Sequence, residues 1–250
     1  MPADDDSREK AGGHVGSFAT TQWSVVLLAR NGQSPQAREA LEQLCRTYWY
    51  ALYAYIRRRG HPHEDAQDLT QGFFARLLEK NWLADIEQQG GRFRSFLLTA
   101  LNRFLAGEYD RAQAVKRGGG RKIFSLDQLP VQERYLHEPA TEETPEKAFE
   151  RHWALTVLDE ALTRLRHETM AAGRAQQFEL LNPFLSREEG QGGYFTIAAQ
   201  LGMSPGAVGV AVHRLRRRYR ELVREGIANT LTAPTQVEDE VRYLFTVLRG

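Results

Sequence analysis

The sequence predicts an all-α protein with two helical bundle domains joined by an acidic linker. Three observations support this prediction. Apolar residues recur at intervals of three and four along several segments, which is typical of helices with one buried face. No segment shows a sustained alternation of apolar and polar residues, so no strand is predicted. Glycine and proline residues separate the periodic segments, as they do between helices.

Four helices are predicted in the N-terminal half. A short helix over residues 20–30 is followed by a long one over 35–60, where Pro35 suits the first helical position. A third helix follows residues 61–62, and acidic residues in its first turns suit the positive end of the helix dipole. A fourth runs over about 93–118, apolar at first and then polar and basic.

The C-terminal half is predicted to hold five more helices. One runs from residue 145 to about 167, and a second includes Phe178 and Leu181. A pair of helices is predicted within residues 195–223, after a glycine-rich break. The last covers residues 237–248 and is amphipathic.

The composition favours a soluble cytoplasmic protein. The chain has 250 residues, of which 42% are apolar, so it can bury one or two modest cores. Cys45 is its only cysteine, which excludes an intrachain disulfide. No apolar run approaches the roughly 18 residues that span a bilayer, so no membrane insertion is expected. The N-terminal segment lacks the features of a signal peptide and is expected to be a disordered tail.

Charge is distributed unevenly along the chain, although the formal net charge is only +1. Residues 92–122 include eight Lys and Arg residues and two acidic residues. Residues 123–150 include seven acidic and two basic residues. Residues 214–224 include six arginines and one acidic residue. The pattern indicates two basic surfaces separated by an acidic linker.

Residues 195–223 have the layout of a helix-turn-helix. Apolar residues up to Leu201 would form the buried face of a short helix, and Gly202 suits a left-handed turn. Ser204 and Pro205 then suit the N-cap and the first turn of a longer, arginine-rich helix. An apolar stripe alone usually marks core packing, and arginines alone a solvated face. Their combination with this turn favours a second helix that lies in the DNA major groove.

Motifs of the common enzyme classes are absent from the sequence. There is no P-loop, no Gly-x-Ser-x-Gly nucleophile elbow and no paired-glycine nucleotide fingerprint. His61 and His63 have no third metal ligand placed near them, and a capped helix start explains both. The sequence therefore predicts a non-catalytic protein without a metal site or a cofactor.

Two further motifs precede the helix-turn-helix. Residues 64–74 read Glu-Asp-Ala-Gln-Asp-Leu-Thr-Gln-Gly-Phe-Phe, and residues 93–98 read Phe-Arg-Ser-Phe-Leu-Leu. Together with residues 201–216, they resemble the polymerase-docking helix, the start of the DNA-melting helix and the promoter-reading helix-turn-helix of one family. This is the bacterial sigma-70 family of RNA polymerase sigma factors, in its extracytoplasmic-function (ECF) type. The motifs occur in the family's order, and the resemblance covers residues 37–118 and 150–225.

The resemblance implies a transcription initiation factor that binds core RNA polymerase and directs it to promoter DNA. An anti-sigma factor or another regulator is a further candidate partner. The resemblance also implies that Asp65, Asp68 and Gln71 bind polymerase, and their spacing places them on one helix face. Acidic residues at this position also stabilise the helix start by about 0.3–1 kcal/mol each, and the two roles are compatible.

The resemblance further implies two DNA-binding surfaces. Around the melting helix, basic residues would neutralise phosphates of the opened minus-ten element, while aromatic rings stack on its bases. Of the aromatic candidates Phe93, Phe96, Phe104 and Tyr109, the second and third lie on the apolar stripe and are expected in the core. In the second surface, the helix-turn-helix reads the minus-thirty-five element. The predicted DNA-binding residues are Arg92, Arg94, Arg103, Arg111, Lys116, Arg117, Ser204, Gly206, Gly209, His213, Arg214, Arg217 and Arg218.

The resemblance divides the chain into five predicted parts. These are a disordered tail (1–19), a polymerase-docking and minus-ten domain (20–118), an acidic linker (119–147), a minus-thirty-five domain (148–228) and a C-terminal helical extension (229–250). The extension either completes the second bundle or binds a regulator.

Two other classes of function stay open on the sequence alone. A helix-turn-helix regulator that binds DNA without acting as a sigma factor does not need a motif like residues 64–74. A decoy that holds polymerase but reads no promoter is compatible with Gly209 and Ala211, because the family often has Lys and Arg at these positions. Transcription with core polymerase distinguishes the three classes.

Overall fold

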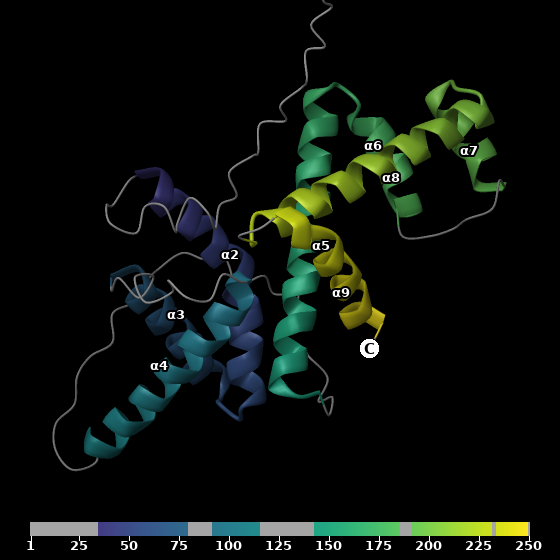
Figure 1. Cartoon of the computed structure of the whole chain (residues 1–250). Coiled ribbons are helices and arrows are strands. Elements are labelled where there is room, and N and C mark those ends of the chain that lie inside the picture. The colour runs from purple at the N-terminus through teal and green to yellow at the C-terminus, as the bar shows by residue number, and fades with distance from the viewer. Residues whose placement is uncertain (1–34, 80–91, 116–142, 186–191, 232–233, 250) are drawn as a thin grey trace, which may run out of the picture.

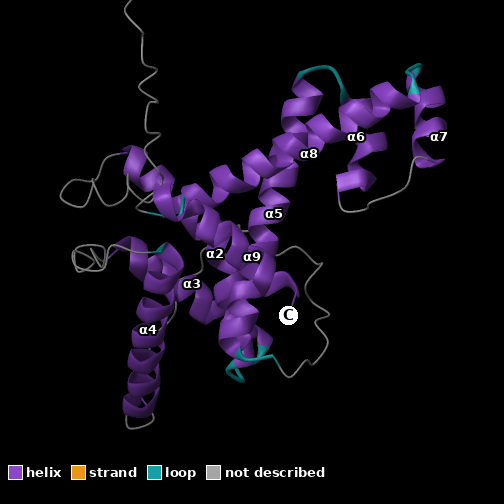
Figure 2. Ribbon diagram, turned by 45° about the vertical axis from the view of Figure 1, so that its right-hand side comes forward, coloured by secondary structure: helices purple, strands orange, loops and turns teal. Residues whose placement is uncertain are grey.

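The computed structural model of the chain is helical throughout its described part (Figures 1 and 2). The structure describes residues 35–79, 92–115, 143–185, 192–231 and 234–249. Within these ranges there are eight α-helices, two 3-10 helices and no strand, which confirms the all-α prediction. The N-terminal tail, the helix expected over 20–30 and most of the acidic linker lie outside the described residues.

The first three helices are α2 (Pro35–Arg58), α3 (His63–Glu79) and α4 (Phe93–Val115). A glycine ends α2, because the turn to α3 requires a φ of +92° at Gly60, a value that other residues rarely adopt. The second half of α4 extends away from the other described helices (Figures 1 and 2).

The longest helix is α5 (Pro145–Ala171), with 27 residues. Thr144 caps it by accepting a hydrogen bond from the backbone N–H of Lys147 at 3.3 Å. The helix ends four residues later than the sequence pattern predicts, because the chain reverses only at Gly173, where φ is +70°. It is followed by the short helix α6 (Ala175–Leu181) and a 3-10 turn, η4 (Asn182–Leu185).

The remaining helices are α7 (Gly192–Leu201), α8 (Pro205–Ala228) and α9 (Val237–Arg249), with the 3-10 turn η5 (Pro234–Gln236) before α9. The predicted glycine-rich break is thus partly helical, since α7 includes its last two glycines. In the described part of the chain no single helix has the length and apolar composition to cross a membrane. Only α7 and α8 taken together pass that test, and they form a bent pair.

The main core forms where α5 packs along α2 (Figure 1). Trp153 is fully buried in it, and the ring of Phe149 stacks on that of Tyr48 with centroids 6.2 Å apart. Helix α9 packs against α5 and α8, and its Leu244 is fully buried in the same core. The core therefore continues from α2, α3 and α4 into α5, α8 and α9.

A second, smaller core lies at the N-terminal half of α8, where α6, η4 and α7 pack against it (Figure 1). Its buried side chains are Leu181, Phe184, Ala198, Val208 and Val212. This cluster fixes the position of α7 against α8.

We expect Phe149→Ala to lower the free energy of unfolding by about 3–5 kcal/mol, because it removes a buried ring from the interface of α2 and α5. Urea unfolding followed by circular dichroism measures this change. Met170→Ala, at an exposed position of the same helix, should change it by less than about 0.5 kcal/mol. Equal effects of the two substitutions would contradict this packing.

Candidate functional site

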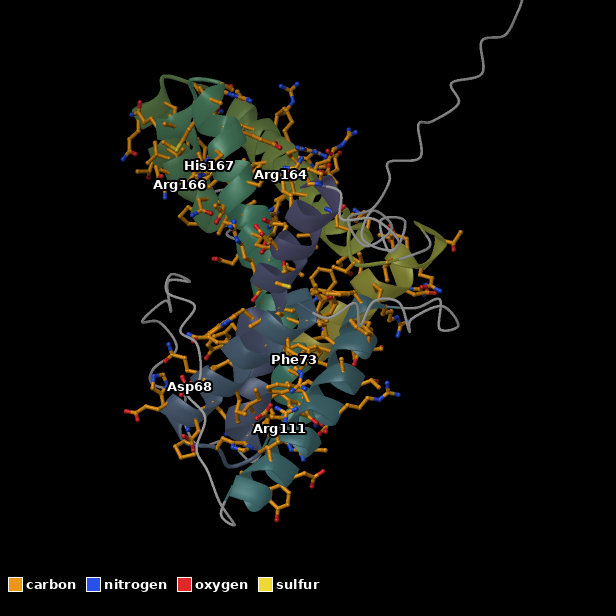
Figure 3. All side chains as sticks on the ribbon, turned by 90° about the vertical axis from the view of Figure 1, so that its left-hand side faces the viewer. Asp68, Phe73, Arg111, Arg164, Arg166 and His167 are labelled. Carbon is orange, nitrogen blue, oxygen red and sulfur yellow. The ribbon has the colours of Figure 1, made fainter. Side chains whose placement is uncertain are left out.

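One face of α3 is acidic and exposed. Asp65 and Asp68 are exposed, and Gln71 is half-buried one turn further along. On the opposite side Phe73 is fully buried, with its ring centroid 5.8 Å from that of Phe104 in α4. Figure 3 shows Asp68 at the outside of the molecule and Phe73 toward the interior. Within the described residues neither aspartate forms an ion pair, so both carboxylates are available to a partner.

The first turn of α4 lies in a buried junction. Arg94 is only 6% exposed, and its Nη2 lies 3.2 Å from a carboxylate oxygen of Glu240 in α9. Arg92 forms a second ion pair with the same carboxylate. The Arg94 guanidinium also lies 4.9 Å from the ring centroid of Trp153 and 4.2 Å from that of Tyr243. Arg94 is therefore enclosed in this structure, and a contact with DNA would require the junction to open.

The rest of α4 carries the other basic residues predicted to bind DNA. Arg103 is exposed, and it has no ion-pair partner among the described residues. Arg111 is half exposed and forms an ion pair with Glu108 on the same helix. Lys116 and Arg117 lie outside the described residues. Arg103 is thus the predicted cation of this helix that is both exposed and unpaired.

The four aromatic residues of α4 divide into buried and exposed rings. Phe93 is fully buried, with its ring edge-on to Tyr48 at 5.2 Å between centroids. Phe104 is buried and Phe96 is half-buried. Tyr109, with 65% of its surface exposed, is the one of the four that presents an open ring to a base.

Helices α7 and α8 meet at a tight turn. The chain bends by 97° between Gly193–Leu201 and Pro205–Ala228, within the range of helix-turn-helix units. Gly202 adopts a φ of +63° at this turn, and the Ser204 hydroxyl accepts a hydrogen bond from the N–H of Ala207 at 3.2 Å. The residues that the sequence assigns to the turn and the cap thus have these structural roles.

Helix α8 has a continuous outer face. Exposed side chains follow one another on it at intervals of three and four residues. These residues are Gly206, Val210, His213, Arg217, Arg220 and Arg224. Arg214 is also exposed and borders a groove of about 560 Å³ between α8, α5 and α6. The face is cationic, with one exposed apolar side chain in its first half.

Arg218 differs from the other predicted cations of α8 because carboxylates surround it. Its Nε and Nη2 donate hydrogen bonds to the two oxygens of Glu168 in α5, at 2.8 and 2.9 Å. Its Nη1 donates to Glu221 and Glu225, at 3.2 and 3.1 Å. The hydrogen bonds from Arg218 hold the pKa of Glu168 below its ordinary value. Arg218 therefore ties α8 to α5 in this structure. Arg217 is highly exposed, and among the described residues its bonded partner is Glu221.

Gly209 and Ala211 do not lie on the outer face of α8. Gly209 is half-buried, and a Cβ added to it would lie 3.7 Å from Cε2 of Tyr194 in α7. Ala211 packs against the smaller core. The absence of Lys or Arg at these two positions therefore removes no cation from the exposed face.

The sequence patterns did not predict three features of the site. Val210 is 51% exposed on the outer face, although a valine in a helical stripe usually marks the core. Val210 lies four residues from Gly206 and from Arg214, which are both exposed, and only two from the buried Val208. This spacing could have placed Val210 on the outer face and not in the buried stripe. Glu168 and Glu240 are the carboxylates that engage Arg218 and Arg94, and no local spacing indicates either pair.

An all-helical chain with this helix pair and an arginine-rich outer face falls in the class of helical DNA-binding proteins. The comparison with protein families is more specific. The chain matches the family described as ECF sigma factor over residues 25–224, most of its length, and it belongs to that family. As a sigma factor it binds RNA polymerase and directs promoter recognition in transcription initiation. Neither the curated proteins nor the solved structures gave a match.

We expect Gly209→Ala to raise the free energy of unfolding by up to about 1 kcal/mol, because alanine is the better helix former and the added Cβ meets Tyr194 at an ordinary contact distance. Chemical denaturation measures the difference. Gly206→Ala, in the first turn where no atom lies within 4 Å, is the matched control and should change stability less. A loss of stability in Gly209→Ala would show that α7 needs the glycine for its approach to α8.

Proposed function

We propose that this sigma factor docks on core RNA polymerase through α3 and reads promoter DNA through the outer face of α8. Its role is that of a non-catalytic specificity subunit. The observation that carries the docking proposal is the pair Asp65 and Asp68, which are exposed and unpaired within the described residues while the other side of α3 is buried. A helix that only completes a core does not need this arrangement.

The DNA-binding proposal rests on the geometry and charge of α8. A helix in the major groove presents a row of side chains to base edges, and basic residues beside it contact phosphates. On α8, three side chains would face the major groove of the DNA, namely Val210, His213 and Arg217, and Arg214 lies beside them. In the minus-ten part, Arg103 and Tyr109 are the exposed cation and ring that opened DNA would meet.

The alternative of a DNA-binding regulator that does not act through polymerase is tested by one assay. The purified full chain, added to bacterial core RNA polymerase, should form a stable complex and start transcription from a subset of promoter fragments. A folded chain that binds DNA but does not associate with core polymerase would refute the proposal. A chain that associates but starts no transcript would support the decoy. An anti-sigma factor as a partner stays a prediction.

We expect Asp68→Arg to weaken binding to core polymerase by at least about tenfold, because it reverses a charge at the centre of the proposed docking face. Fluorescence anisotropy of the labelled chain, titrated with core polymerase, measures the affinity. Asp239→Arg makes the same charge change on an exposed position of α9 and should leave the affinity unchanged. An unchanged affinity in a folded Asp68→Arg protein would remove α3 from the interface.

We expect Arg214→Ala to lower the affinity of the polymerase complex for promoter DNA and to reduce the salt dependence of binding by about one phosphate contact. Filter binding over a range of potassium chloride concentrations measures both quantities. Arg166→Ala removes the same charge from an exposed position on α5, where the arginine bonds to Glu179 at 2.8 Å, and serves as control. If the salt slope of Arg214→Ala equals that of the wild type, Arg214 makes no phosphate contact.

A further inference from the structure

We propose that α9 is an autoinhibitory clasp, in which Glu240 holds the buried Arg94, pairs with the partly exposed Arg92, and must withdraw before Arg94 can bind promoter DNA. The inference rests on the proposed DNA-binding role of the start of α4. It concerns a helix outside the part of the chain that matches the family, which ends at residue 224.

The junction is a meeting point of distant segments. Glu240 and Arg94 are 146 residues apart in sequence, and both are almost fully buried. The backbone also joins the two segments, since the N–H of Phe93 donates to the carbonyl of Thr230 at 3.1 Å. Next to this bond an antiparallel bridge pairs Arg92 with Leu231. The start of α4 is therefore tied to the segment that leads into α9 by backbone bonds and by charge.

The chemistry of the contact is that of a phosphate site. Two guanidinium groups share one carboxylate, and a DNA phosphate offers the same negative charge with oxygens in a similar arrangement. Glu240 thus occupies the position that a phosphate would take. Because the rings of Trp153 and Tyr243 flank Arg94, α5 and α9 exclude DNA from this guanidinium while the junction is closed.

One feature favours opening of the junction. Within the described residues Nη1 of Arg94 is buried without a hydrogen-bond partner, which offsets part of the gain from its ion pair. Opening would let water or a phosphate satisfy this nitrogen. Release of α9 must also separate its half-buried apolar side chains from the main core, and these are Val237, Val241, Tyr243, Val247 and Leu248.

The test is the affinity of the free full chain for a single-stranded oligonucleotide. Glu240→Gln removes the carboxylate charge with little change in shape, and we expect it to bind about tenfold more tightly, because the open state becomes more populated. Asp239→Asn removes the same charge from the neighbouring exposed position and should bind like the wild type. If Glu240→Gln folds and binds DNA no more tightly than Asp239→Asn, the ion pair is structural and the clasp is refuted.

A second measurement needs no substitution. Hydrogen exchange of residues 237–249 in the wild-type chain should speed up when core polymerase and promoter DNA are added. Slower or unchanged exchange would refute release of α9. The two proposals can fail separately. Transcription by the wild-type chain with core polymerase tests the proposed function, and its result does not depend on how tightly Glu240→Gln binds the oligonucleotide.

Discussion

The packing of α5 along α2 holds together the helices on either side of the acidic linker. It brings the helix that follows the acidic linker into the core of the helices that precede it, through rings such as Phe149 and Tyr48. Once α5 is fixed, α8 and α9 pack on its remaining faces, and α9 reaches the start of α4. The α3 surface and the outer face of α8 remain exposed, while the first turn of α4 does not. The same packing therefore decides which predicted contacts are available before polymerase binds.

Local signals in the sequence predicted the helices well. The predicted cap at Ser204 and the left-handed glycine at position 202 have their structural counterparts, because a helix end depends on residues within one turn of it. The family resemblance is confirmed by the match over residues 25–224. Assignments of individual site residues stay predictions, since they concern contacts with partners.

Long-range pairing could not be predicted in this way. The sequence around Arg94 and Arg218 does not distinguish them from arginines that are exposed. In the structure, a carboxylate from another helix pairs with each of them. Whether an arginine is free depends on which acidic residue the fold brings beside it, and the spacing of residues along one helix says nothing of that. Arg214 and Arg103, by contrast, are exposed as the pattern suggests. The division of the chain into two bundle domains stays a prediction. In this structure the main core takes side chains from both sides of the acidic linker.

If α9 withdraws from the start of α4 when the chain binds core polymerase, the distance between these two helices must grow. Pulsed electron paramagnetic resonance between spin labels at Ala106→Cys in α4 and Thr246→Cys in α9, both exposed positions, measures this distance. Burial raises the pKa of the native Cys45 thiol to about 12, so this thiol should not take up label. A clasp that opens on polymerase gives one narrow distance distribution for the free chain and a different, longer one with core polymerase. A broad distribution in the free chain, or the same distance in both states, would contradict it.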